Sequence, residues 1–91
     1  MTYYVYLVSC VDGTYYCGYT ADLKNRVNEH NFSKTGAKYT KSRRPVKLVY
    51  TEQLPSKVLA MRREREIKKY SRKEKKTLIH SNIDIKPSSQ L

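Results

Sequence analysis

An Asp-Gly pair between two aromatic and β-branched runs constrains the fold of this chain more than any other feature. Residues 3–10 and 15–20 have the composition of β-strands, and Asp12-Gly13 separates them. This arrangement is a strong short-range signal for a hairpin. We therefore predict that the chain begins with two antiparallel strands.

The type of turn decides which side chains share a face of the hairpin. A two-residue turn at Asp12-Gly13 places Tyr6 and Tyr16 on opposite faces. A type I turn over Val11-Asp12, with Gly13 left-handed as a bulge, places the two tyrosines on the same face. The sequence leaves both registers open.

The rest of the chain alternates between helical and extended patterns. Leu23, Val27 and His30 recur at helical spacing, whereas residues 32–45 are polar and without period. We predict a helix over 21–31, a loop over 32–45, a strand over 46–53, a helix over 56–69 and a last helix over 71–79. The resulting fold class is α+β, with a three-stranded antiparallel sheet flanked by helices. With 91 residues, we expect one domain over 1–80 and a flexible C-terminal tail over 81–91.

The charge is strongly positive and unevenly distributed. Nineteen Lys and Arg residues oppose eight Asp and Glu residues, a net charge of +11, and only Lys24 and Arg26 precede Ser33 among the basic residues. Such a basic region predicts a polyanionic partner. The alternative is a solvated helix face that is rich in lysine.

Two features bear on the compartment. Cys10 and Cys17 are the only cysteines, too few for a disulfide framework or a zinc site, so a reducing environment is expected. The first residues have no basic segment of a signal peptide, and no apolar run reaches the ~18 residues of a membrane span. We expect a cytoplasmic protein that makes no contact with a membrane.

Glu64 is the most informative acidic residue. At 100° per residue, Ala60, Met61, Glu64 and Ile67 fall within an arc of about 120° on their helix, whereas Glu66 lies on the opposite side. A carboxylate in an apolar stripe needs a cation, a hydrogen-bond network or a metal. A salt bridge and a metal site both satisfy this pattern.

His30 and the tyrosines are the other candidates. His30 lies on the apolar arc of its helix, one turn from Arg26, so it is either a core residue or a neutral imidazole that accepts a proton. Nine tyrosines accompany one phenylalanine and no tryptophan, so several hydroxyl groups must be exposed or hydrogen-bonded.

In their order and spacing, these residues resemble the GIY-YIG nuclease superfamily. Tyr4-Val5-Tyr6 and Tyr16-Cys17-Gly18 correspond to its two signatures, with Tyr4 in place of a glycine and Cys17 in place of an isoleucine, and Arg26 and Glu64 follow on helices. The segments Ala37–Thr40, Arg43–Pro45 and Ile67–Lys69 are similar to a small, single-domain and functionally uncharacterised bacterial branch.

The resemblance implies a DNA endonuclease with low sequence specificity that uses a single Mg²⁺ or Mn²⁺ ion. It implies that Glu64 binds the metal, Arg26 braces the phosphate, and Tyr16 acts as general base or orients the water. Tyr6 and His30 would then position this water or relay a proton. The nucleic acid, DNA in preference to RNA, would be gripped by basic residues of the loop and the last two helices: Lys38, Lys41, Arg43, Arg44, Arg63, Lys68, Lys69 and Arg72.

Two other functions fit the same residues. One is a non-catalytic module that binds nucleic acid through its basic and tyrosine side chains. The other is a protein that docks on an acidic protein surface. We favour the nuclease because a binding module has no need for Glu64 in an apolar arc near an arginine and two tyrosines. The sequence contains no sign of an obligate protein partner.

Overall fold

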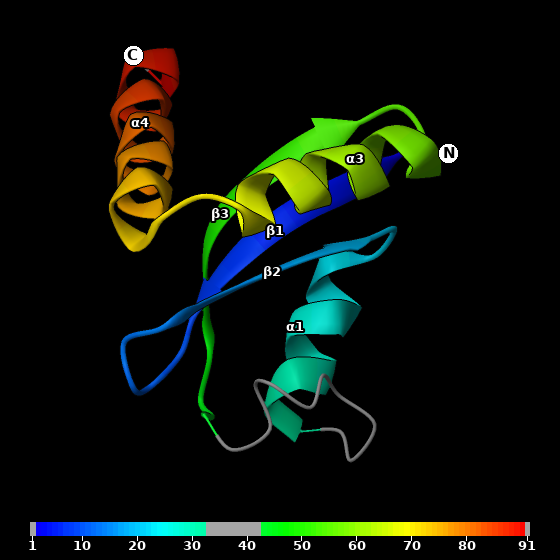
Figure 1. Ribbon diagram of the computed structural model, residues 1–91. Coiled ribbons are helices and arrows are strands. Elements are labelled where there is room, and N and C mark those ends of the chain that lie inside the picture. The colour runs from blue at the N-terminus through cyan, green and yellow to red at the C-terminus, as the bar shows by residue number, and fades with distance from the viewer. Residues whose placement is uncertain (1, 33–42, 91) are drawn as a thin grey trace.

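The computed structural model describes residues 2–32 and 43–90, with side chains described up to residue 81. The elements are β1 (Tyr3–Ser9), β2 (Tyr15–Thr20), α1 (Leu23–Phe32), β3 (Lys47–Leu54), α3 (Lys57–Lys68) and α4 (Arg72–Gln90). The three strands form one antiparallel sheet in the order β2-β1-β3 (Figure 1). The predicted α+β class is confirmed. Residues 33–42 of the predicted loop lie outside the described residues.

The hairpin between β1 and β2 adopts the bulged register. Val8 lies opposite Tyr16, and Tyr6 lies opposite Gly18. Gly13 has a φ of 84°, and its amide donates to the Cys10 carbonyl at 2.9 Å. A left-handed glycine after a type I turn is the signature of this bulge. Tyr6 and Tyr16 therefore share a face of the sheet.

Helices cover both faces of the sheet (Figure 1). Residues of α3 and α4, Ala60, Ile67 and Ile79, pack with Leu7 and Cys17 on one face. The opposite face carries a smaller buried group, Tyr6, Val8, Cys10 and Val46, against which Leu23 of α1 packs. Strand β2 forms one edge of the sheet, and α1 and α3 lie on opposite sides of it.

Side-chain hydrogen bonds fix both ends of α1. Asp22 caps its first turn by accepting from the Asn25 amide at 3.1 Å. At the other end, Asn31 donates to the Val46 carbonyl at 3.1 Å and accepts from the Val46 amide at 2.7 Å. This paired contact ties α1 to the chain that enters β3.

The last helix begins as predicted but runs further. Ser71 Oγ accepts from the Glu74 amide at 3.1 Å, and Glu74 Oε1 accepts from the Ser71 amide at 2.8 Å, so the capping box is formed. The helix continues to Gln90, whereas we expected it to end at Ile79 and to give way to a non-helical tail. No glycine or proline interrupts residues 72–86, so no residue type in this segment breaks the backbone hydrogen-bond ladder.

None of the described helices combines the length and the apolar character that a membrane crossing requires.

Candidate active site at the edge of the sheet

An open cleft of about 420 Å³ lies along the edge strand β2. Residues from both faces of the sheet line it, because α1 and α3 meet β2 from opposite sides (Figure 1). We call it the tyrosine cleft and define it by Tyr6, Tyr16, Gly18, Arg26, Lys57 and Glu64. Four of the residues that the resemblance singled out, Tyr6, Tyr16, Arg26 and Glu64, are thus brought together.

Tyr6 and His30 form a buried hydrogen-bonded pair. The Tyr6 hydroxyl lies 2.8 Å from Nε2 of His30, and both side chains are buried. Burial, followed by the nearby Tyr16, raises the pKa of the Tyr6 hydroxyl above its ordinary value. Burial and the positive charge of Arg26 lower the pKa of His30. Both groups are therefore neutral at pH 7, and Tyr6 is a poor candidate for a base.

Gly18 also belongs to the site, although in the sequence it stands out only as part of the Tyr16-Cys17-Gly18 motif. A Cβ atom at this position would lie 2.4 Å from the Tyr6 hydroxyl oxygen and 2.6 Å from its ring carbon Cζ. Only glycine leaves room for the Tyr6 ring to cross β2 and reach His30. A glycine inside a strand pattern indicates such a close approach, so the signal was present in the sequence.

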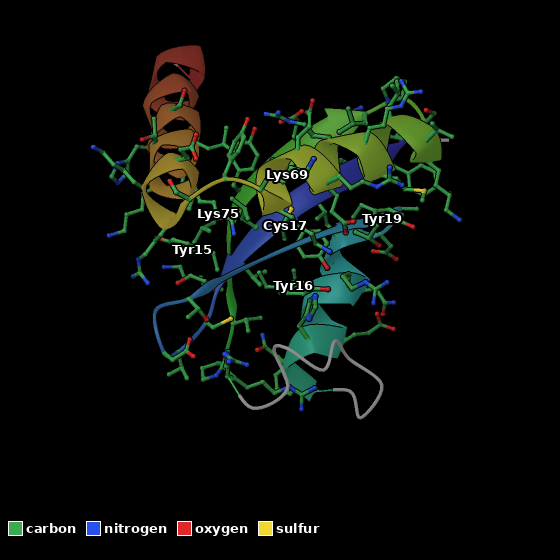
Figure 2. All side chains as sticks on the ribbon, in the orientation of Figure 1. Tyr15, Tyr16, Cys17, Tyr19, Lys69 and Lys75 are labelled. Carbon is green, nitrogen blue, oxygen red and sulfur yellow. The ribbon has the colours of Figure 1, made fainter. Side chains whose placement is uncertain are left out.

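Tyr16 lies between His30 and a lysine of α3. Its ring is in edge contact with the His30 ring, with 5.3 Å between centroids, and the Lys68 ammonium lies 5.9 Å from the Tyr16 ring centre. Figure 2 shows Tyr16 pointing from β2 toward α1, whereas Cys17 points toward α3. Tyr16 is half-buried and lines the cleft, so its hydroxyl is better placed than that of Tyr6 to meet a water molecule.

Arg26 lies on the α1 side of the cleft. Its Nη1 is 3.4 Å from Glu29 Oε1, one turn along the helix, and both side chains are exposed. Ion pairs of this kind contribute little because water screens them. The guanidinium group is therefore free to exchange Glu29 for a phosphate, which it matches with two parallel hydrogen bonds.

Glu64 is the carboxylate of the cleft, and it is not equivalent to Glu66. The Glu64 side chain is 17% exposed and pairs with Lys68 at 3.6 Å, whereas Glu66 is 62% exposed and pairs with Arg63. Mg²⁺ is usually held by one or two carboxylates together with water and substrate phosphates. Glu64 fits this role, because its partner Lys68 is half-exposed and the cleft is open to water and a phosphate. Within the described residues, no group of three acidic, histidine or cysteine side chains is placed to hold a metal.

Cys17 packs next to the backbone of Glu64, and its thiol is unreactive. Its thiol points at the Glu64 carbonyl oxygen at 3.9 Å. Burial, followed by the negative charge of Glu64, raises the pKa of the thiol to about 12. A neutral, buried thiol serves here as a small apolar contact between β2 and α3.

Several of the basic residues that are predicted to contact nucleic acid form hydrogen bonds with other groups of the protein. The Arg43 guanidinium donates to Asp12 at 2.9 Å, and Arg63 donates to Glu52 at 3.0 Å. Arg44 donates to the carbonyls of His30 and, at 3.2 Å, of Glu29, at the end of α1. Lys69 and Arg72 are exposed, Lys68 pairs with Glu64, and Lys38 and Lys41 lie outside the described residues.

The fold and the cleft have a counterpart among known protein families. Residues 2–77 match the family model described as the GIY-YIG catalytic domain. This chain belongs to that family.

Within this family, the chain is similar to the UPF0213 proteins. It is 53% identical over 79 residues to the UPF0213 protein of Syntrophus aciditrophicus, which covers 87% of this chain and 91% of that protein. It is 54% identical over 76 residues to a UPF0213 protein of Halobacterium salinarum, with 84% and 97% covered.

Two solved structures have the same fold. The solution NMR structure of a UPF0213 protein from Bacillus halodurans is 48% identical and has a TM-score of 0.56, covering 88% of this chain and 84% of that one. The solution NMR structure of a protein from E. faecalis is 40% identical and has a TM-score of 0.62, with 89% and 85% covered.

Proposed function

We propose that this protein is a divalent-metal-dependent endonuclease that hydrolyses phosphodiester bonds in DNA with low sequence specificity. The observation that carries the proposal is the convergence of Tyr16, Arg26 and Glu64 on one open cleft beside the neutral Tyr6–His30 pair. Hydrolysis of a phosphodiester needs an oriented water, a group that neutralises developing charge, and a means to stabilise the leaving oxygen. The cleft has a candidate for each.

The roles follow from position and charge. Arg26, at the exposed side of the cleft, would bind the non-bridging oxygens of the phosphate and stabilise the charge that develops on them. Tyr16 would orient the water or act as the general base that accepts its proton. Tyr6 and His30 lie deeper in the site and are joined by a 2.8 Å hydrogen bond. This pair would position the same water or relay a proton.

Glu64 would hold Mg²⁺ or Mn²⁺, with water and the substrate phosphate completing the coordination. A divalent ion in this position supplies Lewis-acid stabilisation of the leaving oxygen. Lys68 must release Glu64 for this to occur. Because Lys68 is half-exposed, its ammonium group regains water when it leaves.

The same proposal includes the cytoplasm as the compartment of the protein and DNA as its partner. Cys10 and Cys17 are free and buried, as suits the reducing cytoplasm, where the chain would meet DNA.

The first experiment is cleavage of labelled single-stranded, duplex, flap and branched DNA with Mg²⁺ or Mn²⁺. Wild-type protein is compared with Glu64→Gln and with Glu66→Gln, a matched acid on the same helix that lies outside the cleft. We expect Glu64→Gln to reduce cutting by about 100-fold or more, because it removes the ligand that holds the metal. Glu66→Gln should cut at the wild-type rate.

One observation favours a second function, a non-catalytic module that binds nucleic acid. Glu64 already has a cationic partner in Lys68, which satisfies the carboxylate without a metal. Tight, salt-sensitive binding without cutting by either wild type or Glu64→Gln would support this module and overturn the nuclease.

A further inference from the structure

A second, smaller pocket lies beside the tyrosine cleft, on the α4 side of β2. Its volume is about 180 Å³, and it is lined by Thr14, Tyr15, Arg72 and Lys75. We call it the hairpin pocket, because it lies between the hairpin that joins β1 to β2 and the first turns of α4. Figure 2 shows Tyr15 and Lys75 in the space between β2 and α4.

The position of Arg72 in the hairpin pocket is fixed by contacts with its neighbours. The guanidinium carbon of Arg72 lies 5.7 Å from the centre of the Tyr15 ring, a distance at which the ring face attracts the cation. Nη2 of Arg72 lies 3.6 Å from the position that a Cβ atom at Gly13 would take, an ordinary contact distance, so the guanidinium group lies against the hairpin turn. Tyr15 and the hairpin turn thus orient Arg72 toward the pocket.

The acidic residues nearby are already engaged. Glu74 accepts from the Ser71 amide at 2.8 Å as part of the helix cap. Asp12 accepts from the Thr14 hydroxyl at 2.6 Å and from Arg43 at 2.9 Å. In the part of the chain that the structure describes, neither Arg72 nor Lys75 forms an ion pair with a carboxylate. The pocket therefore presents two positive charges that suit an anion.

The two pockets are adjacent along one exposed edge. Tyr15 and Tyr16 are consecutive residues of β2 whose side chains point to opposite faces, one into each pocket. No strand of the described sheet lies outside β2, so the edge between the pockets is open. Cys17, between Tyr16 and Gly18 on β2, contacts the Glu64 backbone at 3.9 Å and also feels the charge of Lys75, so the two sites lie close together on the α3 and α4 side of the sheet.

We propose that the hairpin pocket binds a second backbone phosphate of the nucleic-acid strand whose phosphodiester lies in the tyrosine cleft. Arg72 and Lys75 hold this phosphate, and Tyr15 is a positioning residue that orients Arg72. The strand then crosses the edge of β2 between the two sites. The inference rests on the proposed nucleic-acid substrate, but it requires only binding and not cleavage.

The test is a binding measurement with Glu64→Gln protein, in which no cutting disturbs the equilibrium. Into this background we introduce Arg72→Ala with Lys75→Ala or, as a matched control, Arg62→Ala with Lys73→Ala. The control removes one exposed arginine of α3 and one exposed lysine of α4, both of which lie outside both pockets. Affinity for a labelled single-stranded oligonucleotide is measured between low and moderate salt.

We expect the pocket variant to bind about tenfold more weakly, and its slope of log affinity against log salt to fall by about 0.7, as the loss of one neutralised phosphate on a single strand requires. The control should keep a slope close to that of the parent protein. Equal losses in both variants would overturn the proposal, because they would mean that only overall charge matters. Unchanged affinity of the pocket variant would also overturn it, because Arg72 and Lys75 would then not contact the oligonucleotide.

Tyr15→Leu and Tyr15→Phe separate positioning from charge. Both keep Arg72 and Lys75, but only phenylalanine keeps an aromatic ring beneath the guanidinium group. We expect weaker binding for Tyr15→Leu and near-parental binding for Tyr15→Phe, with unfolding curves confirming that each variant is folded. If wild type binds through the hairpin pocket but never cuts, the pocket stands and the nuclease proposal fails.

Discussion

At the scale of single residues, the smallest side chain in the cleft determines the position of one of the largest. The Tyr6 ring crosses β2 directly over Gly18 to reach His30, and any side chain at Gly18 would occupy the same space. The Tyr16-Cys17-Gly18 segment therefore combines a tyrosine that lines the cleft with a glycine that admits a second tyrosine from the neighbouring strand.

Gly18→Ala tests this dependence. We expect it to destabilise the protein by about 1–3 kcal/mol, as overpacking in a closely packed site does. Because the clash is with Tyr6, the same change should cost less in a Tyr6→Val background, and the two substitutions should not be additive. Urea unfolding of the four proteins of this cycle measures the coupling. Additive costs would mean that Tyr6 does not occupy the space above Gly18.

We expect His30 to make the stability of the folded protein depend on pH in the mildly acidic range. Protonation would place a charge in a buried ring that faces Tyr6 and Tyr16 from the sheet, Arg26 and Glu29 from α1, and Arg44. Burial, then Arg26, lowers its pKa below the ordinary 6.5 in the folded protein only, so the unfolded chain takes up the proton more readily. The free energy of unfolding should therefore fall as the pH drops below about 6.5.

The measurement is denaturant unfolding at pH 7.5 and at pH 5.5. His30→Gln should be less stable than wild type at pH 7.5 but should lose less stability on acidification, because the titrating group is gone. His80→Gln removes the other histidine, which is exposed on α4, and should keep the wild-type pH dependence. An undiminished acid effect in His30→Gln would show that another group is responsible.

At the scale of elements, the hairpin shows what the sequence could and could not determine. The strand composition and the Asp12-Gly13 pair predicted the hairpin, but two registers satisfied the same pattern. The left-handed backbone of Gly13, with its φ of 84°, selects the register that puts Tyr6 and Tyr16 on one face. One backbone angle thus decides whether the tyrosines can share a cleft.

Substitution of Gly13 tests the bulge. Gly13→Ala should cost about 1–2 kcal/mol, because a side chain disfavours a left-handed backbone, whereas Gly13→Asn should cost less, because asparagine tolerates it. The Arg72 guanidinium leaves ordinary contact distance for a Cβ atom, so the cost comes from the backbone and not from a clash. Thermal unfolding of the two variants makes the comparison. Equal stability of both variants and wild type would contradict a strained turn.

Other parts of the site depended on neighbours that sequence periodicity does not contain. The position of Glu64 in an apolar arc followed from helical spacing, and its side chain is indeed largely buried. The contacts of Arg43, Arg44 and Arg63 with Asp12, α1 carbonyls and Glu52 join segments that are distant in the chain. A basic residue that ties two elements together and one that awaits a phosphate look alike in a sequence.

At the scale of the whole molecule, charge and core are separated along the chain. The first 32 residues form the hairpin and α1 and contain only two of the nineteen basic residues. α3 and α4 contribute buried residues to one face of the sheet and present much of the remaining positive charge outward. The tyrosine cleft lies at the junction of these two parts, where a polyanion drawn to the basic helices would meet Arg26 and Tyr16.

The packing of α4 predicts where the folded domain ends. Ile79 of α4 is 7% exposed and belongs to the core that Leu7, Ala60 and Ile67 form, so the domain must include the helix at least to this residue. Ile79→Ala should therefore cost about 2–5 kcal/mol, as loss of a buried aliphatic side chain does. Termination of the chain after His80 keeps Ile79 and should cost less than about 1 kcal/mol, because residues 81–91 are predicted to lie outside the domain. Urea unfolding of both variants decides the boundary: if the truncated chain loses as much stability as Ile79→Ala, the last turns of α4 are part of the folded unit.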